Sequence, residues 1–487
     1  MKRFTTSSLP ALALLGLVLG GCQPELDQPT ASAGSADFSR YIAVGNSLTA
    51  GFSDNGLYRE GQLNSYPSIL AQQFAQVGGG PFVQPLFTEA QSKGSGYVQL
   101  LGFTPATATA LSSPITGTVA GNGGRSTATS APYTKFLDPI NNLGVPGIRM
   151  SDILTPGYGS LAGNPYFERI TPDATPLQTY LQRVQATVAS IKPTFFTEWL
   201  GNNDVLGYAT AGGAVASSGI TPATTFAVNT SYVLDALTAG GAKGVVATIP
   251  DVTNIPFFTA VGPSFRANLD LNKVPTAAPF VYTTGVLAPG QANTRVSTTI
   301  ASVRDANGTG NLLLTLTASP YVSLYGRPSG KYWRDFYRQA TGAAPTGPAF
   351  SGFLTAIGVT DTTKGFGQAT ENPFPSTLVL DGTEQTNVTS ATNNFNATLT
   401  AAANTRQLAI FDSNAFFRGV AQGGYVTNGV NNTAGFISGN LFSLDGVHPT
   451  PRGYAVIANE MMKVINAKYG SSLRQVDANS YRGVLFP

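Results

Sequence analysis

Residues 41–48 read Tyr41-Ile42-Ala43-Val44-Gly45-Asn46-Ser47-Leu48, an unbroken apolar run that enters a turn at Gly45. Such runs are typical of parallel strands, which are buried on both faces of their sheet. Ser47 would then project from the carboxyl end of a central strand, where open α/β sheets place their ligand crevice. The alternative is that Gly45 and Asn46 form an ordinary turn and that Ser47 only caps the next helix.

Buried-type strands alternate with helices along the rest of the chain. We expect further strands at 195–200, 245–249 and 408–411, and helices at 66–74, 177–191, 226–237, 384–405 and 451–468. Pro176 suits the first turn of the helix at 177–191. This alternation predicts a parallel sheet that is covered by helices on both faces.

Two long segments interrupt this alternation, at about 88–137 and 256–376. The first is rich in Gly, Ser and Thr up to about residue 131, and we expect it to be irregular. The second is of mixed character. We interpret both as insertions on one domain that spans 38–487, not as separate domains.

The composition excludes some classes of protein. The chain has 487 residues, of which 42% are apolar, so a sizeable core is available and disorder throughout is excluded. Only 11% are charged, as suits an exported protein with polar loops. The formal net charge of +3 includes Lys2 and Arg3 of the N-terminal segment. Because no basic cluster remains, we expect no nucleic-acid partner.

The N-terminal segment has the pattern of a targeting signal. Two basic residues precede an apolar stretch, Leu9 to Leu19, that is too short to span a bilayer. It ends in Leu19-Gly20-Gly21-Cys22, which resembles a bacterial lipobox. We therefore expect a lipoprotein signal peptide (1–21), lipid attachment at Cys22, a polar tether (22–37), and a membrane-anchored, extracytoplasmic location in the cell envelope, at the outer membrane or cell surface. The alternative is a plain secretory signal in which Cys22, the only cysteine, is incidental.

His448 is the only histidine of the chain and lies in Leu444-Asp445-Gly446-Val447-His448-Pro449. If the protein is a hydrolase with a nucleophile and an imidazole base, that base must be His448. Asp445, three residues earlier, can hydrogen-bond the Nδ1–H of the ring and leave Nε2 to take a proton from a serine. A surface histidine near the last helix is the alternative, because D-x-x-H is common by chance.

Two further segments carry groups that could stabilise a developing negative charge. Gly201-Asn202-Asn203-Asp204 follows the predicted strand at 195–200, where an asparagine amide could donate to a developing oxyanion. One such donor contributes about 3–4 kcal/mol of transition-state stabilisation. Asn142-Leu143-Gly144-Val145-Pro146-Gly147 offers glycines whose backbone N–H groups can approach a substrate closely. An Asx turn and an ordinary loop are the alternatives.

Together, and in this chain order, the four segments resemble the blocks of the GDSL, or SGNH, family of serine esterases. The matching residues are Ser47 in GNSL, Gly147 in NLGVPG, Asn203 in GNND, and His448 in DGVHP with Asp445. The resemblance implies a three-layer α/β/α, flavodoxin-like fold with long loop insertions. It also implies a nucleophile, Ser47, a base, His448, and an orienting carboxylate, Asp445. The oxyanion would be held by the backbone N–H groups of Ser47 and Gly147 and by the amide of Asn203.

The expected function is hydrolysis of a carboxylic ester, in an acylated carbohydrate or a lipid, at the cell envelope. No metal or organic cofactor is needed, and no G-x-S-x-G elbow of ordinary α/β-hydrolases is present. Two alternatives stay open: transfer of the acyl group to a sugar hydroxyl, and a surface lipoprotein that binds glycans or a partner. Asn46 departs from the family name, which has Asp there, and the long insertions make substrate inference by analogy unsafe.

Overall fold

The computed structural model describes residues 31–126, 132–287 and 293–487. The predicted signal peptide, Cys22 and the tether up to residue 30 lie outside the described residues. None of the helices in the described ranges has the length and apolar character needed to cross a bilayer.

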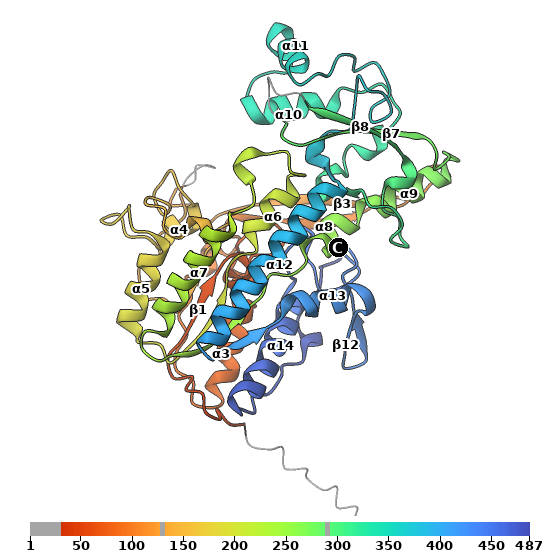
Figure 1. The fold of residues 1–487 in the computed structure, drawn as a ribbon. Helices are drawn as coiled ribbons and strands as arrows, with labels where there is room; N and C mark the ends of the chain where they lie inside the picture. Colours follow the sequence, from red (N-terminus) through yellow and green to blue (C-terminus); the bar gives the residue numbers. More distant parts are fainter. Residues whose placement is uncertain (1–30, 127–131, 288–292) are drawn as a thin grey trace, which may run out of the picture.

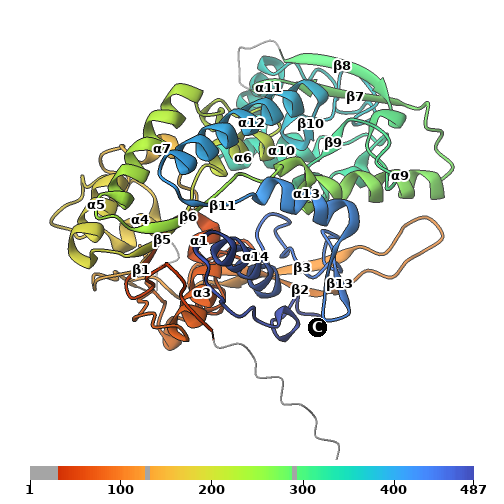
Figure 2. The ribbon, with the colours of Figure 1, turned by 60° about the horizontal axis from the view of Figure 1, so that its bottom comes forward.

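A five-stranded parallel sheet forms the centre of the molecule (Figures 1 and 2). Its strands are β1 (Tyr41–Gly45), β4 (Asn142–Gly144), β5 (Phe195–Trp199), β6 (Lys243–Ala247) and β11 (Ala409–Phe411). Their order across the sheet is β4-β1-β5-β6-β11, and every neighbouring pair is parallel. Counted along the chain, this is the flavodoxin-like order 2-1-3-4-5, whose ligand crevice lies at the carboxyl ends of its first and third strands. The predicted fold class is therefore confirmed.

Helices cover both faces of the sheet, which lies between the two helical layers in Figure 2. On one face α3 (Tyr66–Ala75) packs against α14 (Pro451–Tyr469). On the other face α7 (Ala223–Thr238) lies between α5 (Tyr180–Ile191) and α12 (Gly382–Thr405). The apolar sides of these helices and the buried strands form one continuous core.

Helix α5 begins later than its apolar spacing predicts. Thr179 and Gln182 form a capping box, in which each side chain accepts the backbone N–H of the other residue. This box fixes the first helical residue at Tyr180. Leu177 precedes the helix and is 68% exposed. The prediction that the helix starts at Leu177, with Pro176 in its first turn, is therefore wrong.

The first insertion is more regular than its composition indicates. It contains an antiparallel hairpin of β2 (Gly96–Phe103) and β3 (Pro114–Ala120), so the expectation of an irregular segment is wrong. The loop between the two strands reaches α9 (Val261–Leu271), where the N–H of Leu111 donates to Oδ1 of Asn268 over 2.9 Å. The hairpin thus links the two insertions.

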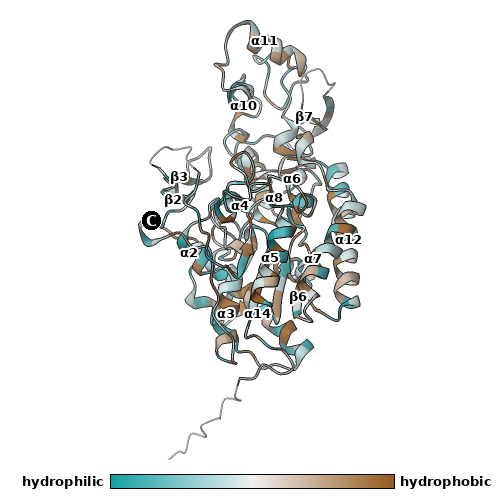
Figure 3. Ribbon diagram, turned by 90° about the vertical axis from the view of Figure 1, so that its left-hand side faces the viewer, coloured by the Kyte–Doolittle hydropathy of each residue, from teal (hydrophilic) through white to brown (hydrophobic). Residues whose placement is uncertain are grey.

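Residues 256–287 and 293–380, which we call the lobe, pack largely around a second hydrophobic cluster. Trp333 and Phe374 are fully buried in it. The lobe includes α8 (Pro256–Thr259), α9, β7 (Pro279–Thr284), β8 (Thr294–Thr299), α10 (Lys331–Thr341), α11 (Gly347–Ala356) and the short pair β9 (Leu313–Leu314) and β10 (Val379–Leu380). It lies at the end of the molecule opposite to α3, as Figures 1 and 3 show.

Candidate active site

Ser47 lies where the sequence predicts, directly beyond the carboxyl end of β1. It is the first residue of a short helix, α1 (Ser47–Ala50), which Asn46 caps by accepting the N–H of Leu48 at Oδ1 over 3.0 Å. Gly45 permits this tight turn, because a Cβ there would lie 2.0 Å from Oγ1 of Thr49. The Ser47 side chain is consequently held at the edge of the sheet where α/β proteins bind ligands.

The structure brings Ser47, His448 and Asp445 together, although 401 residues separate the serine from the histidine. Nε2 of His448 lies 2.9 Å from Oγ of Ser47, and Nδ1 lies 2.9 Å from Oδ2 of Asp445. Phe52 packs against the imidazole, with 4.7 Å between the ring centroids. Since an ionised carboxylate only accepts hydrogen bonds, Nδ1 is the donor and Nε2 of the neutral ring faces Ser47 as an acceptor.

Asp445 is kept ionised by the groups around it. Burial alone would raise the pKa of this carboxyl, but His448 and backbone N–H donors outweigh burial and lower it to about 2. Oδ1 accepts the N–H groups of Val447 and His448, both over 2.8 Å. Oδ2 accepts the N–H of Asn55 over 2.8 Å. The carboxylate therefore orients the imidazole from a turn that its own hydrogen bonds hold closed.

A loop after α1 supports this turn, and sequence reasoning missed it. Asp54 and Asn55 both have left-handed backbone conformations, with φ of 51° and 60°. Oδ1 of Asp54 accepts the N–H of Leu444 over 3.0 Å, and its own N–H donates to Oγ of Ser443 over 2.9 Å. The pair Asp54-Asn55, between Ser53 and Gly56, could have indicated a tight turn. It could not have indicated that this turn bonds to Leu444, which lies 390 residues further along the chain.

Gly147 and Asn203, two of the three predicted oxyanion donors, lie beyond the carboxyl ends of strands adjacent to β1. Gly147 follows β4 and has a φ of +83°, which favours glycine. Asn203 begins α6 (Asn203–Thr210), directly after β5, and its Nδ2 donates to the carbonyl of Ile148 over 2.8 Å. An amide carries two N–H bonds, so one remains for a substrate. Among the described residues, no backbone acceptor is bonded to the N–H of Ser47 or of Gly147.

Asp204 links the first turn of α6, which begins with Asn203, to the segment after Gly147. Its carboxylate accepts the N–H groups of Met150 over 2.7 Å and Ser151 over 3.3 Å. Burial raises the pKa of Asp204 to about 6, against the lowering effect of these donors and Thr221. This contact holds the start of α6 against the segment that follows Gly147.

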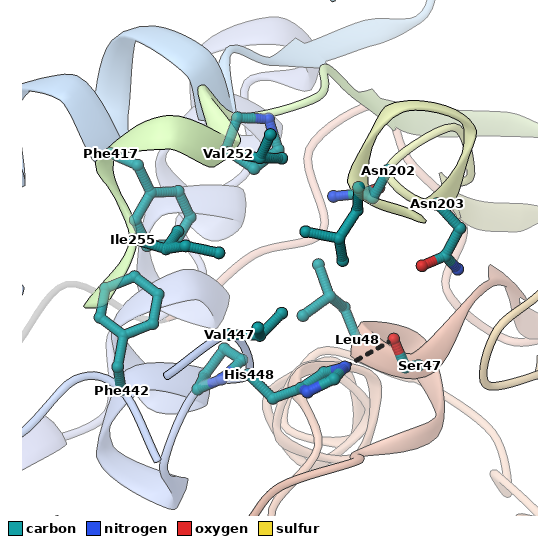
Figure 4. A pocket seen from close by; sticks show the side chains of 13 residues that line it. Ser47, Leu48, Asn202, Asn203, Val252, Ile255, Phe417, Phe442, Val447 and His448 are labelled. Atoms are coloured by element: carbon teal, nitrogen blue, oxygen red, sulfur yellow. Dashed lines mark hydrogen bonds between the residues drawn. The ribbon is translucent and has the colours of Figure 1, made fainter. Parts of the chain in front are cut away.

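Asn202 is a second residue that sequence reasoning passed over. Its Oδ1 accepts a hydrogen bond from Nδ2 of Asn46 over 3.0 Å, in the buried turn beside Ser47. This bond directs the amide nitrogen of Asn202 away from Asn46, and Figure 4 shows it on the side of the pocket. The doubled asparagine in GNND was visible in the sequence, but only Asn203 was given a role.

A narrow pocket opens beside Ser47 and His448 (Figure 4). Polar side chains lie at the Ser47 end, where Asn202 and Asn203 face it. The rest of its wall is mainly apolar and includes Val252, Ile255, Phe417 and Phe442. The arrangement can therefore hold a reacting polar group at one end and hydrocarbon along the rest.

No cluster of three or more His, Cys, Asp or Glu side chains suited to a metal ion occurs in the described part of the chain. The groups that converge on the pocket are instead a hydroxyl, an imidazole, a carboxylate and amides. These groups suit acyl transfer to a serine hydroxyl.

The doubly wound sheet, with a serine and a histidine at its carboxyl edge, defines an α/β protein with a hydrolase-type site. The family model described as GDSL-like Lipase/Acylhydrolase matches residues 41–461. The chain belongs to this family and is a hydrolase that acts on ester bonds. The match begins at β1 and ends within α14, so it includes all the residues described above as part of the site. No curated protein matches the chain.

Proposed function

We propose that the protein is a serine esterase in which Ser47 is the nucleophile, His448 the general base and Asp445 the orienting carboxylate. The observation that carries this proposal is the continuous chain of two 2.9 Å contacts from Oγ of Ser47 through the imidazole to Oδ2 of Asp445. The substrate is a carboxylic ester of an acylated carbohydrate or a lipid.

The reaction has two halves. Nε2 of His448 takes the proton of Ser47 as Oγ attacks the ester carbonyl, and the tetrahedral oxyanion accepts hydrogen bonds from the N–H groups of Ser47 and Gly147 and from the Asn203 amide. His448 then protonates the leaving alcohol and next activates a water that hydrolyses the acyl-serine. Asp445 stays ionised throughout the neutral range, because its pKa is about 2, and it stabilises the imidazolium that forms.

Removal of either reacting side chain tests the assignment. We expect Ser47→Ala and His448→Ala to lower kcat for p-nitrophenyl butyrate by at least about 10³-fold, because nucleophile and base act as a unit. Thermal unfolding should change little, since neither side chain fills the core. Ser264→Ala, at an exposed serine of α9, is the matched control and should keep full activity.

An active His448→Ala variant would contradict the proposal decisively, because the chain has no other histidine to replace it. Full activity of Ser47→Ala would likewise exclude Ser47 as the nucleophile. Mass spectrometry after treatment with a fluorophosphonate gives an independent readout, since the reagent should label Ser47 and no residue in the His448→Ala variant.

We also propose that the protein is anchored at the cell envelope through an acylated Cys22, on its extracytoplasmic side. The proposal is supported by the basic start, the short apolar stretch and the small residues before the only cysteine. Lipid attachment of this kind needs no spanning helix.

A further inference from the structure

The pocket beside Ser47 has the chemistry of a hydrocarbon-binding site. We propose that it holds the acyl chain of the substrate, so that the protein prefers esters of aliphatic acids longer than acetate. This assignment rests on the proposed esterase reaction and adds the part of the substrate that the pocket selects.

The wall of the pocket is built from three separate parts of the chain (Figure 4). Val252 and Ile255 follow β6, immediately before the lobe begins. Phe417 comes from α13 (Ser413–Gly423), and Phe442 from the segment before His448. Val252, Ile255 and Phe442 are buried and belong to the main core, so they form a firm apolar surface.

The apolar character of the pocket wall determines which part of a substrate can bind there. Away from Ser47 and the two asparagines, a sugar ring would lose the hydrogen bonds of its hydroxyls to water without new partners, at a cost of about 1–3 kcal/mol for each group. A methylene in the same place gains about 0.8 kcal/mol when it leaves water. The pocket therefore suits hydrocarbon, and a carbohydrate portion of the substrate would lie outside it.

The order of the reaction steps indicates whether the pocket holds the acyl group or the alcohol of the ester. The acyl group stays bonded to Ser47 through the second half of the reaction, whereas the alcohol must leave before water can attack. A pocket that begins at Ser47 and is lined by core residues therefore holds the acyl group, which stays bonded to the serine. The cavity is small, with a volume of about 40 Å³, and this limits the length of the chain that it can hold.

Phe417 offers a way to change this length without disturbing the core, since it is only partly buried. Phe417→Ala should lengthen the pocket and Phe417→Trp should shorten it. Phe486→Ala is the matched control, because this phenylalanine is 60% exposed near the C-terminus and does not line the pocket.

The test measures kcat/KM for p-nitrophenyl esters from acetate to palmitate. In the unchanged protein we expect a rise of up to about fourfold for each methylene that the pocket buries, followed by a plateau or a fall. Phe417→Ala should move the optimum to longer chains and Phe417→Trp to shorter ones, while Phe486→Ala leaves it in place. A parallel series of acetate esters of straight-chain alcohols should show no comparable rise.

The possible results separate this assignment from the esterase reaction itself. If acetate were the best substrate, or if both Phe417 variants kept the optimum, the acyl pocket would be wrong while the esterase remained. A chain-length optimum in the alcohol series alone would assign the pocket to the alcohol and overturn our proposal. Absence of Ser47-dependent turnover on every ester would overturn the esterase and the acyl pocket together.

Discussion

Asn46 stands where the name of the GDSL family has Asp, and its contacts explain how the amide serves there. Its Oδ1 caps α1 by accepting the N–H of Leu48, and its Nδ2 donates to Oδ1 of Asn202. A carboxylate could make the first of these bonds but not the second, because it has no hydrogen to donate. Asn at position 46 therefore orients the Asn202 amide, with the amide oxygen toward Asn46 and the nitrogen directed away from it.

Glu198 is a buried carboxyl to which sequence reasoning gave no role. It lies on β5, only 1% exposed, with Oε1 accepting the N–H of Leu200 over 3.0 Å and no partner for Oε2 among the described residues. Burial raises its pKa from the ordinary 4.5 to about 8. The folded protein therefore holds a proton there that the unfolded chain releases.

This proton makes the stability fall as the pH rises. Between about pH 4.5 and 8 the folded state binds one proton more than the unfolded state at Glu198, so the free energy of unfolding decreases by at most about 1.4 kcal/mol per pH unit. Glu198→Gln, which is neutral in both states, should remove this slope. Urea unfolding at pH 5, 6.5 and 8 measures it, with Glu89→Gln as the control at a side chain that is 83% exposed. A variant with the slope of the unchanged protein would mean that Glu198 is ionised when folded.

At the scale of elements, the loop at Asp54 supports the turn that carries His448. Burial raises the pKa of Asp54, but the carboxyl is well bonded: Oδ1 accepts from Leu444, and Oδ2 accepts from the hydroxyl of Tyr58 over 2.8 Å. Arg482 lies 3.8 Å from it and also pairs with Glu60. Asp54 touches neither Ser47 nor the imidazole, so it acts as a positioning residue.

Replacement of Asp54 should displace the turn that carries His448, so that the imidazole is present but less well oriented. We expect Asp54→Ala to leave the N–H of Leu444 without a partner, to lower the free energy of unfolding by about 1–3 kcal/mol, and to reduce kcat by up to about 10²-fold with little change in KM. Asp54→Asn should restore most of kcat, because its Oδ1 can still accept from Leu444. Glu60→Gln changes the same Arg482 pairing without touching the turn and should remain fully active; equal losses in both variants would assign the effect to Arg482.

The elements that the sequence predicts well are those with an unambiguous apolar pattern. β1, β5 and α14 were predicted to within a residue or two, because the two strands are fully buried and the helix buries one continuous apolar face. The hairpin of β2 and β3 was missed because β3 is largely exposed and buried residues do not alternate regularly along β2. The start of α5 was misplaced because a capping box overrides apolar spacing.

The site residues were predictable to the extent that local motifs carry them. Ser47, Asn203 and the Asp445–His448 pair each stand in a short motif at a strand end or a turn. Asn202 and Asp54 depend on partners far away in the sequence, and the apolar wall combines Ile255 with Phe417 from different elements. Such contacts are set by the tertiary fold and leave no local pattern.

At the scale of the whole molecule, the lobe and the sheet are joined at the site. Ile255 lies in the wall of the pocket directly before α8, and the N–H of Phe257 donates to the carbonyl of Gly446 in the turn before His448 over 2.9 Å. The hairpin adds a second link, because β2 bonds to the loop at Asp54 while its distal loop reaches α9. The two insertions thus contact the turn before His448 and the loop at Asp54 from outside the sheet.

The proposed anchor makes a prediction that concerns the intact chain. In a bacterial host fed labelled palmitate, the full-length protein should take up the label, and Cys22→Ala should not, because lipoprotein acylation requires the cysteine. Ser32→Ala, in the tether region, is the control and should be labelled normally. Label retained in Cys22→Ala would exclude the lipobox assignment.

The end of the described chain nearest to Cys22 lies far from the pocket. The N–H of Ser35 donates to the carbonyl of Tyr469 over 2.8 Å, at the last residue of α14, and the Ser35 carbonyl accepts from Lys243 at the amino end of β6. Ser47 and His448 lie at the carboxyl ends of the strands, on the opposite side. A lipid anchor at Cys22 would therefore join the domain on the side away from the pocket, so that attachment to a bilayer leaves the pocket entrance uncovered. Esters in solution or on a facing surface would then have direct access to Ser47.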